Sequence, residues 1–483
     1  MTAPVRRQLF DDTWFIQRRA RLLHPFHKEV GRRMRAVASL HQGAALIHRP
    51  GDKTHEATER ALTHLASRHA TATRAHMQFY RACLESTGLV PADRIMAAAV
   101  QIEWFWYTTP FKGFYRDHLA HVMKVALTAL ELLLDEYGAL AEDTGTGPPR
   151  PLIHRVAEGL STGRLGTDAL RMAARRFGNE ETTLHDPAFW RDAVLEATKL
   201  AGLLHDLAYP SMMASKVLKA AAPVHALLPL PMGTPDTTDT LARAVARLGS
   251  RLLTSPFRGG ALGNGPLSSE AAAVCAHVLE MSHSLRAGLA ILEYGAHSDE
   301  VWRLSPFEAF VVDWAAHAAA LHDYDKLYEE RPKPGQPPRT PLERWLEQPA
   351  NVRAVQPSFR RDPVCYLVAL ADQLQDFGRM NYHREPTNAG ADTDQAPLRI
   401  RYPWHRVELS VEGARARLAF HLAPPDATGC FGVAPGDRTA LRDRKLRDAT
   451  AIFGARGWLD HEGLFEEVEL LAPDSPLALV ASA

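Results

Sequence analysis

The stretch TKLAGLLHDLAYP, from Thr198 to Pro210, joins an apolar helical run to a polar pair. The run ends at adjacent His205 and Asp206, and Pro210 then stops the helix. Consecutive helical residues diverge by roughly 100°, but near a helix end an imidazole nitrogen and a carboxylate oxygen can still turn toward one metal ion. The same pair is equally typical of a polar helix cap. Its meaning therefore depends on whether other helices carry ligand-type residues on apolar faces.

The composition places the chain among ordinary globular proteins. Its 483 residues exceed one hydrophobic core and predict about two or three packing units. With 56 basic and 56 acidic residues the formal net charge is zero, so charge gives no argument for a nucleic acid or a membrane surface as partner. No uninterrupted apolar run approaches the ~20 residues that a membrane span requires.

Two further features of the composition bear on the compartment. The N-terminal residues carry charges where a signal peptide needs an apolar core, so we expect no export signal. The four cysteines lie far apart without a CxxC pair, which is typical of reduced residues in a cytoplasmic protein. The Ala- and Arg-rich usage suggests a GC-rich bacterial gene.

The pattern along the chain predicts a mainly α protein in three parts. Residues 1–100 read as helices (12–40 and 54–86) that pack on the core without recognisable chemistry. Residues 101–383 contain the strongest amphipathic helices. Residues 398–483 alternate apolar and polar residues around Glu412-Gly413, which predicts a β-hairpin within a small α+β unit.

The sequence predicts the structure of two segments of the middle part and of the segment that follows it. Residues 269–294 read as one helix that continues past His283. Residues 331–363 are rich in proline and read as irregular. Residues 384–397 are polar and punctuated by Gly and Pro, which predicts a linker between the helical part and the α+β unit.

Ligand-type residues recur on helix faces that are otherwise apolar. His121 shares a stripe with apolar residues on a helix from Tyr115 to Tyr137, and His283, His322 and Asp372 sit in the same way on later helices. Taken singly, such a residue is more often a hydrogen-bonded core residue than a ligand. Several separate burials of polar side chains would be costly, however, unless these side chains converge on something that satisfies them.

The ordered set resembles the HD-domain metal-dependent phosphohydrolases. The family pattern His…His-Asp…Asp is matched by His121 in HLAHVMKVAL, by His205 and Asp206 in LAGLLHDLA, and by Asp372 in VALADQLQDFGR. The resemblance covers roughly residues 101–383 and implies a helical HD-type bundle. Residues 207–210 lack the Gly and Lys that phosphodiesterase branches of the family often carry after the His-Asp pair.

The resemblance also implies a second metal site. Members that hold two metals add histidines between the His-Asp pair and the last Asp, and His283 in EMSHSLRAG and His322 in AALHDYDK match that variant. It implies one or two divalent ions (Mn, Fe, Mg, Ni or Zn), with Asp206 as the bridging carboxylate. Lys124 is then a candidate phosphate contact, and His118 a candidate for fixing the tautomer of a ligand.

Three functions compete at this point. The first is hydrolysis of a small phosphate ester, with a nucleotide as the expected substrate. The second is an oxygenase, because the HD fold also hosts di-iron enzymes similar to myo-inositol oxygenase with the same ligand order. The third is a regulatory or interaction protein whose metal site does not turn over. A homo-oligomer is compatible with each of them.

Overall fold

The structure is a computed structural model of the whole chain. The residues that it describes are 5–11, 77–78, 80–96, 118–142, 148–178, 181–208, 282–302, 304–324, 327, 335, 337–377, 381–384, 398–401, 403–424, 433, 435–455 and 457–473. The predicted helix at 12–40 and most of the one at 54–86 lie outside these ranges, whereas residues 80–87 are helical as expected.

Helices dominate the described residues, so the protein is mainly α, as predicted. Besides the helical residues 80–87 and 92–96, the helices in chain order are α6 (His118–Leu134), α7 (Leu152–Ser161), α8 (Thr167–Phe177), α9 (Glu181–Leu184), α10 (Pro187–Leu204), α14 (His283–Trp302), α15 (Pro306–Leu321), α17 (Pro341–Leu346), α18 (Pro349–Val355), α19 (Pro363–Leu374) and α20 (Pro435–Phe453). None of the described helices combines the length and the hydropathy of a membrane-spanning segment.

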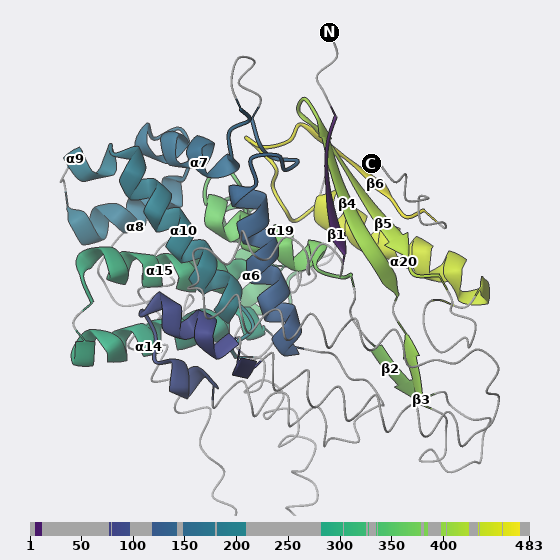
Figure 1. Cartoon of the computed structure of the whole chain (residues 1–483), viewed down its shortest axis with the longest axis horizontal. Helices are drawn as coiled ribbons and strands as arrows, with labels where there is room; N and C mark the ends of the chain where they lie inside the picture. Colours follow the sequence, from purple (N-terminus) through teal and green to yellow (C-terminus); the bar gives the residue numbers. More distant parts are fainter. Residues whose placement is uncertain are drawn as a thin grey trace, which may run out of the picture.

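The strands form a four-stranded sheet and a separate two-stranded one. They are β1 (Arg6–Asp11), β2 (Asn381–Arg384), β3 (Leu398–Arg401), β4 (Trp404–Glu412), β5 (Arg415–Leu422) and β6 (Glu467–Leu471). The larger sheet has the order β1-β4-β5-β6, in which β4 and β5 form the predicted hairpin and α20 connects β5 to the parallel β6. Figure 1 shows this sheet and α20 to one side of the helices.

The first strand corrects the expectation that the N-terminal region is helical throughout. Residues 6–11 pair antiparallel with β4, with Arg6 opposite Val411 and Asp11 opposite Arg406. The start of the chain therefore belongs to the sheet of the predicted C-terminal α+β unit. Since β1 is short and its partner lies near the other end of the chain, local sequence gives little sign of it.

Two further expectations in the middle part were wrong. Ser282 stands outside the helix, its hydroxyl accepts a hydrogen bond from the Ser284 N–H (3.2 Å), and α14 begins at His283. Residues 269–281 of the predicted helix lie outside the described ranges. The segment 331–363 is not irregular throughout, since α17 starts with a capping box between Thr340 and Glu343. Arg384, the first residue of the predicted linker, ends β2, and residues 385–397 lie outside the described ranges; β2 pairs with β3.

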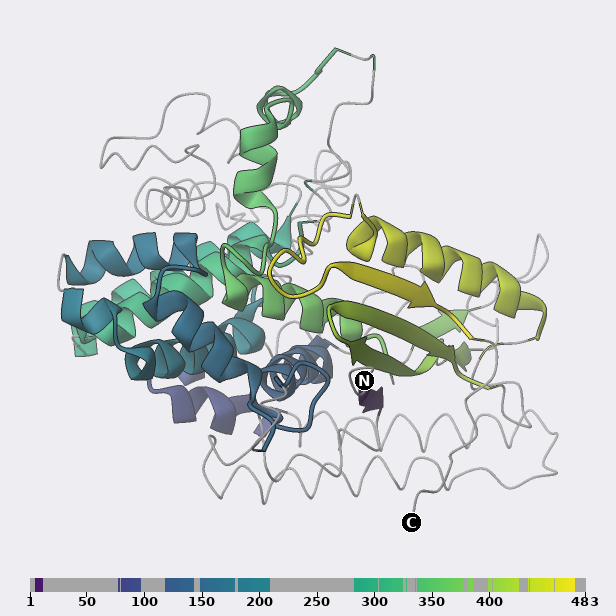
Figure 2. The same cartoon turned by 90° about the horizontal axis from the view of Figure 1, so that it is seen from above.

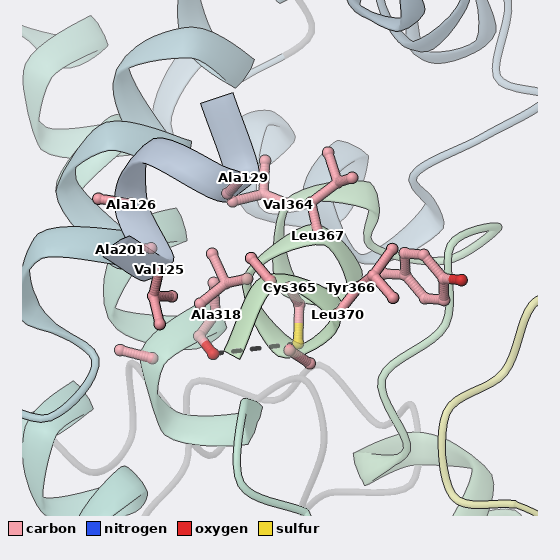
Figure 3. Close-up of a cluster of buried hydrophobic side chains, with 14 of the residues drawn as sticks. Val125, Ala126, Ala129, Ala201, Ala318, Val364, Cys365, Tyr366, Leu367 and Leu370 are labelled. Carbon is pink, nitrogen blue, oxygen red and sulfur yellow. Dashed lines mark hydrogen bonds between the residues drawn. The ribbon is translucent and has the colours of Figure 1, made fainter. Parts of the chain in front are cut away.

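The helices that carry the candidate ligands pack against one another in the buried core. Helix α10 packs on α6, α7 and α15, and the aromatic rings of Trp190, Phe310 and Trp314 meet edge to face or tilted between α10 and α15. Figure 3 shows side chains of α19 beside those of α6 (Val125, Ala126, Ala129), α10 (Ala201) and α15 (Ala318), the three helices that α19 contacts. Small residues at these contacts let α19 lie close to the other three helices.

The sheet is joined to the bundle at the end of α19. The ring of Phe10 in β1 stacks on Phe377 at 6.5 Å between centroids, and Lys445 of α20 makes an ion pair with Asp376. The hydroxyl of Tyr366 in α19 and His461 Nδ1 form a hydrogen bond (2.7 Å). In Figure 2 the sheet and α20 accordingly lie directly beside α19.

Candidate metal centre

Six side chains singled out by the ordered pattern converge at one place. They come from five helices or helix ends, α6, α10, α14, α15 and α19. Together they form what we call the six-residue centre: His121, His205, Asp206, His283, His322 and Asp372.

A first group of ligand atoms gathers around His121. Its Nε2 lies 3.0 Å from Asp372 Oδ1, 3.5 Å from Asp206 Oδ2 and 3.3 Å from His205 Nε2. The Nε2 of His205 lies 3.7 Å from Asp206 Oδ2 and 4.0 Å from Asp372 Oδ1. The ligand atoms of His121, His205 and Asp206 thus all lie within 4.8 Å of one another, and Asp372 Oδ1 lies beside the two imidazoles.

A second group gathers around the other oxygen of Asp206. Its Oδ1 lies 2.8 Å from His283 Nε2 and 3.7 Å from His322 Nε2. The rings of His205 and His322 meet edge to face at 4.8 Å, so the two groups adjoin. Asp206 belongs to both groups, one through each carboxylate oxygen.

The distances suit metal ions. Ligand atoms bound at about 2.0–2.2 Å to a common ion lie about 3–4 Å from one another in octahedral or tetrahedral geometry. The separations within both groups fall close to this range. The donor set of imidazole nitrogens and carboxylate oxygens suits Mn, Fe, Ni or Zn, and Mg less well because of its preference for oxygen. The residues therefore fit one or two divalent ions.

Two of the histidines occupy the same position at the ends of two helices. His205 is the C-cap of α10 and His322 is the C-cap of α15, both with helical backbone angles. The Nδ1–H of His205 donates to Gly202 O (2.8 Å), and that of His322 donates to Ala319 O (2.7 Å). In each case the carbonyl oxygen accepts no helical hydrogen bond, because it lies in the last turn of the helix. It keeps the imidazole proton on Nδ1, so Nε2 is available to bind an ion. The negative ends of the two helix dipoles also favour a cation here.

The other two histidines have side-chain partners on Nδ1. His121 donates from Nδ1 to Oε1 of Gln375 in a short hydrogen bond. Nδ1 of His283 lies 3.5 Å from Oδ2 of Asp323. The sequence pattern did not indicate Gln375, because a glutamine at a helix end has no periodic signal.

The charges and the burial at the centre give His283 and His322 different pKa values. Burial alone would lower the pKa of His283, but the charge of Asp206 and its hydrogen bond, together with Asp323 and Asp372, raise it to about 9. Burial, and then the neighbouring His205 and His283, lower the pKa of His322 to about 4. His322 is therefore neutral at ordinary pH, whereas on His283 a metal ion would compete with a proton.

The carboxylate of Asp372 is held in its charged form. Burial would raise its pKa, but the hydrogen bond and charge of His121, followed by the charges of His205 and His322, lower it well below the usual value. Its side chain is 17% exposed and that of His283 is 14% exposed, whereas His205 is completely buried. The centre is thus more accessible from the side of Asp372 and His283.

Glycines bring the ligand helices together. A Cβ on Gly202 would lie 2.6 Å from Ala126 Cα of α6, and a Cβ on Gly288 would lie 2.6 Å from Ala316 O of α15. Such distances are too short for any side chain. Gly202 thus lets α10 approach the helix of His121, and Gly288 lets α14 approach the helix that ends at His322.

Besides Asp206, the sequence predicted roles at the site for Lys124 and His118. Nζ of Lys124 is buried, donates to Phe377 O (3.3 Å) and lies 5.1 Å from the centroid of the Phe377 ring. These contacts join α6 to the end of α19, so the role of Lys124 as a phosphate contact stays a prediction. His118 begins α6, but its side chain is outside the described residues.

Comparison of the chain with protein-family models, with curated proteins and with solved structures finds no match.

Proposed function

We propose that the helical part is an HD-type bundle and that the chain is a metal-dependent phosphohydrolase of small phosphate esters, with a nucleotide as the expected kind of substrate. The observation that carries the proposal is the position of Asp206. Its Oδ2 faces His121 and His205, while its Oδ1 faces His283 and His322. A carboxylate shared in this way suits two adjacent ions, an arrangement typical of phosphate ester hydrolysis.

The charge of the ligand set also supports an anionic substrate. Divalent ions, when bound, supply a water of lowered pKa and positive charge beside the phosphoryl oxygens. The four histidines ligate as neutral imidazoles, and Asp206 and Asp372 contribute one negative charge each. Two carboxylates leave part of the charge of two divalent ions uncompensated. This surplus would attract a phosphate ester.

The remaining groups have positioning roles in the proposal. The side chains of Asp372, His283 and Asp323 are the more exposed ones, so the substrate would approach from their side. Asp323 can hold a proton on His283 Nδ1 and thereby keep Nε2 for the ion. The carbonyl oxygens of Gly202 and Ala319 do the same for His205 and His322.

A substrate panel tests the proposal. The full chain is loaded with Mn²⁺ and incubated with nucleoside phosphates, cyclic nucleotides and an activated phosphodiester, and the products are followed by chromatography. We expect turnover of at least one ester by the wild type and only background in Asp206→Ala. Asp192→Ala is the matched control, because Asp192 lies on α10, the helix that ends just before Asp206, and its side chain is 60% exposed.

Two results would contradict the proposal. One is the absence of phosphate ester turnover in protein that holds its metal. The other is oxygen-dependent turnover by protein that holds two irons per chain, which would favour an oxygenase.

A further inference from the structure

The four histidines of the six-residue centre obtain their Nδ1 partners in different ways. His205 and His322 use a carbonyl at the end of their own helix. His121 cannot do so, because it lies inside the first turns of α6, where backbone carbonyls accept helical hydrogen bonds. Its Nδ1 partner has to come from another element, and this partner is Oε1 of Gln375.

Gln375 lies on the same turn as the ligand Asp372. It is the C-cap of α19, and its backbone N–H is shared between Ala371 O (3.0 Å) and Asp372 O (3.3 Å). One end of α19 therefore contacts both nitrogens of the His121 ring. The carboxylate of Asp372 faces Nε2 at 3.0 Å, and the amide oxygen of Gln375 accepts from Nδ1.

The amide of Gln375 is also incompletely satisfied. The residue is 1% exposed, and among the described residues its Nε2 has no hydrogen-bond partner. A buried amide with an unsatisfied donor is costly, so such a group is expected where its other end has a specific task. The reverse orientation would aim the amide NH₂ at His121 Nδ1 and push the ring proton to Nε2, where the ion should bind.

We infer that Gln375 is a positioning residue of the metal centre. Its amide oxygen holds the proton of His121 on Nδ1 and so reserves Nε2 for the ion of the first group. The inference rests on the metal binding of the proposed function, and it adds a residue outside the set that the resemblance implied. The neutral amide does this without adding a third carboxylate to the charge of the first group.

Metal affinity is the first test, with Mn²⁺ alone as the probe and titration calorimetry on the full chain as the readout. Gln375→Leu removes the acceptor at similar volume and should weaken binding at the first group by about 10- to 100-fold. Gln375→Glu keeps an acceptor oxygen and should restore the affinity. Gln356→Leu is the matched control, because the amide of Gln356 donates to Gly457 O (3.4 Å), outside the centre.

A second readout separates positioning from a loss of structure. In the Zn²⁺-loaded protein, NMR of the imidazole nitrogens should find the His121 proton on Nδ1 in slow exchange with water. In Gln375→Leu this slowly exchanging proton should be lost, while the melting temperature stays close to that of Gln356→Leu.

The outcomes distinguish this inference from the proposed function. Equal Mn²⁺ affinity in wild type and Gln375→Leu, or zinc bound to Nδ1 of His121, would overturn the role of Gln375 alone. Absence of Mn²⁺ binding by the wild-type chain would overturn both.

Discussion

His121 Nε2 lies 3.0 Å from Asp372 Oδ1, although the helices that carry them, α6 and α19, stand at the two ends of the helical part of the chain. Gln375, three residues after Asp372, accepts from the other ring nitrogen. The end of α19 is in turn held by β1, through Phe377, and by α20, through Asp376. The position of α19 thus decides whether the first group of ligands can form.

Gly202→Ala should damage the first group. The added methyl would meet Ala126 of α6 and push α10 from α6, which costs about 1–3 kcal/mol in the free energy of unfolding. Because the helices of His121 and His205 then move apart, Mn²⁺ affinity should fall as well. Urea denaturation and calorimetry measure the two effects.

Gly288→Ala should act in the same way on the second group, since its methyl would meet Ala316 and Ala320 of α15. The control is Gly436→Ala in α20, where no atom of the described residues lies within 4 Å of the added Cβ. In that variant we expect no loss of stability and a gain of up to about 1 kcal/mol. Equal effects at the three glycines would contradict the role of close helix approach.

Lys445→Met should loosen the contact between α20 and α19. Lys445 pairs with Asp376 and lies over the rings of Phe420 (4.6 Å) and Trp404 (5.6 Å). The side chain of Lys445 is 10% exposed, so the variant should lose about 2 kcal/mol in the free energy of unfolding. This loss is smaller than for a fully buried pair, because Asp376 is partly exposed. A double-mutant cycle with Asp376→Asn in urea denaturation should return a coupling energy above about 1 kcal/mol.

The exposed pair of Arg417 and Glu469 is the control for this cycle. Both side chains are at least half exposed, so their coupling energy should stay below about 1 kcal/mol. A coupling energy no larger for Lys445 and Asp376 would show that the pair does not hold the end of α19.

His461 should make the stability depend on acid. Burial lowers its pKa from 6.5 to about 4 in the folded chain. Well above pH 6.5 the imidazole of His461 is neutral in both the folded and the unfolded chain, so its titration does not change the free energy of unfolding. As the pH falls from 6.5 toward 4 the unfolded chain binds a proton that the folded chain does not, so the free energy of unfolding falls by at most about 3 kcal/mol.

Urea denaturation between pH 7 and pH 4 measures this slope in wild type and in His461→Asn. The asparagine can still form a hydrogen bond with the Tyr366 hydroxyl but does not titrate. The difference in stability between the two proteins should therefore shift in favour of the variant as the pH falls. A difference that is independent of pH would contradict the lowered pKa.

The helices that carry the ligands were predictable because each combines an apolar stripe with one polar residue. His121 and Asp372 are examples, and their convergence followed from the cost of burying each of them separately. The capping box of Thr340 and Glu343 was also present in the sequence as a helix start, although the surrounding prolines suggested irregular structure.

Other features had no local signal. Strand β1 is six residues long and pairs with a strand near the other end of the chain, so no pattern within either segment specifies the pairing. Gln375 can be assigned only once the direction of the His121 ring is known. The register of distant contacts and the orientation of a ring are properties of packing, which periodicity does not encode.

The metal content of the purified full chain, dialysed after loading with Mn²⁺, tests most directly whether the six-residue centre binds metal ions. The six-residue centre predicts about two ions per wild-type chain, about one in Asp372→Ala and in His283→Ala, and none in Asp206→Ala, which removes the shared carboxylate. A wild-type chain that retains no ion, or an Asp206→Ala chain that retains the wild-type content, would contradict a metal centre built on Asp206.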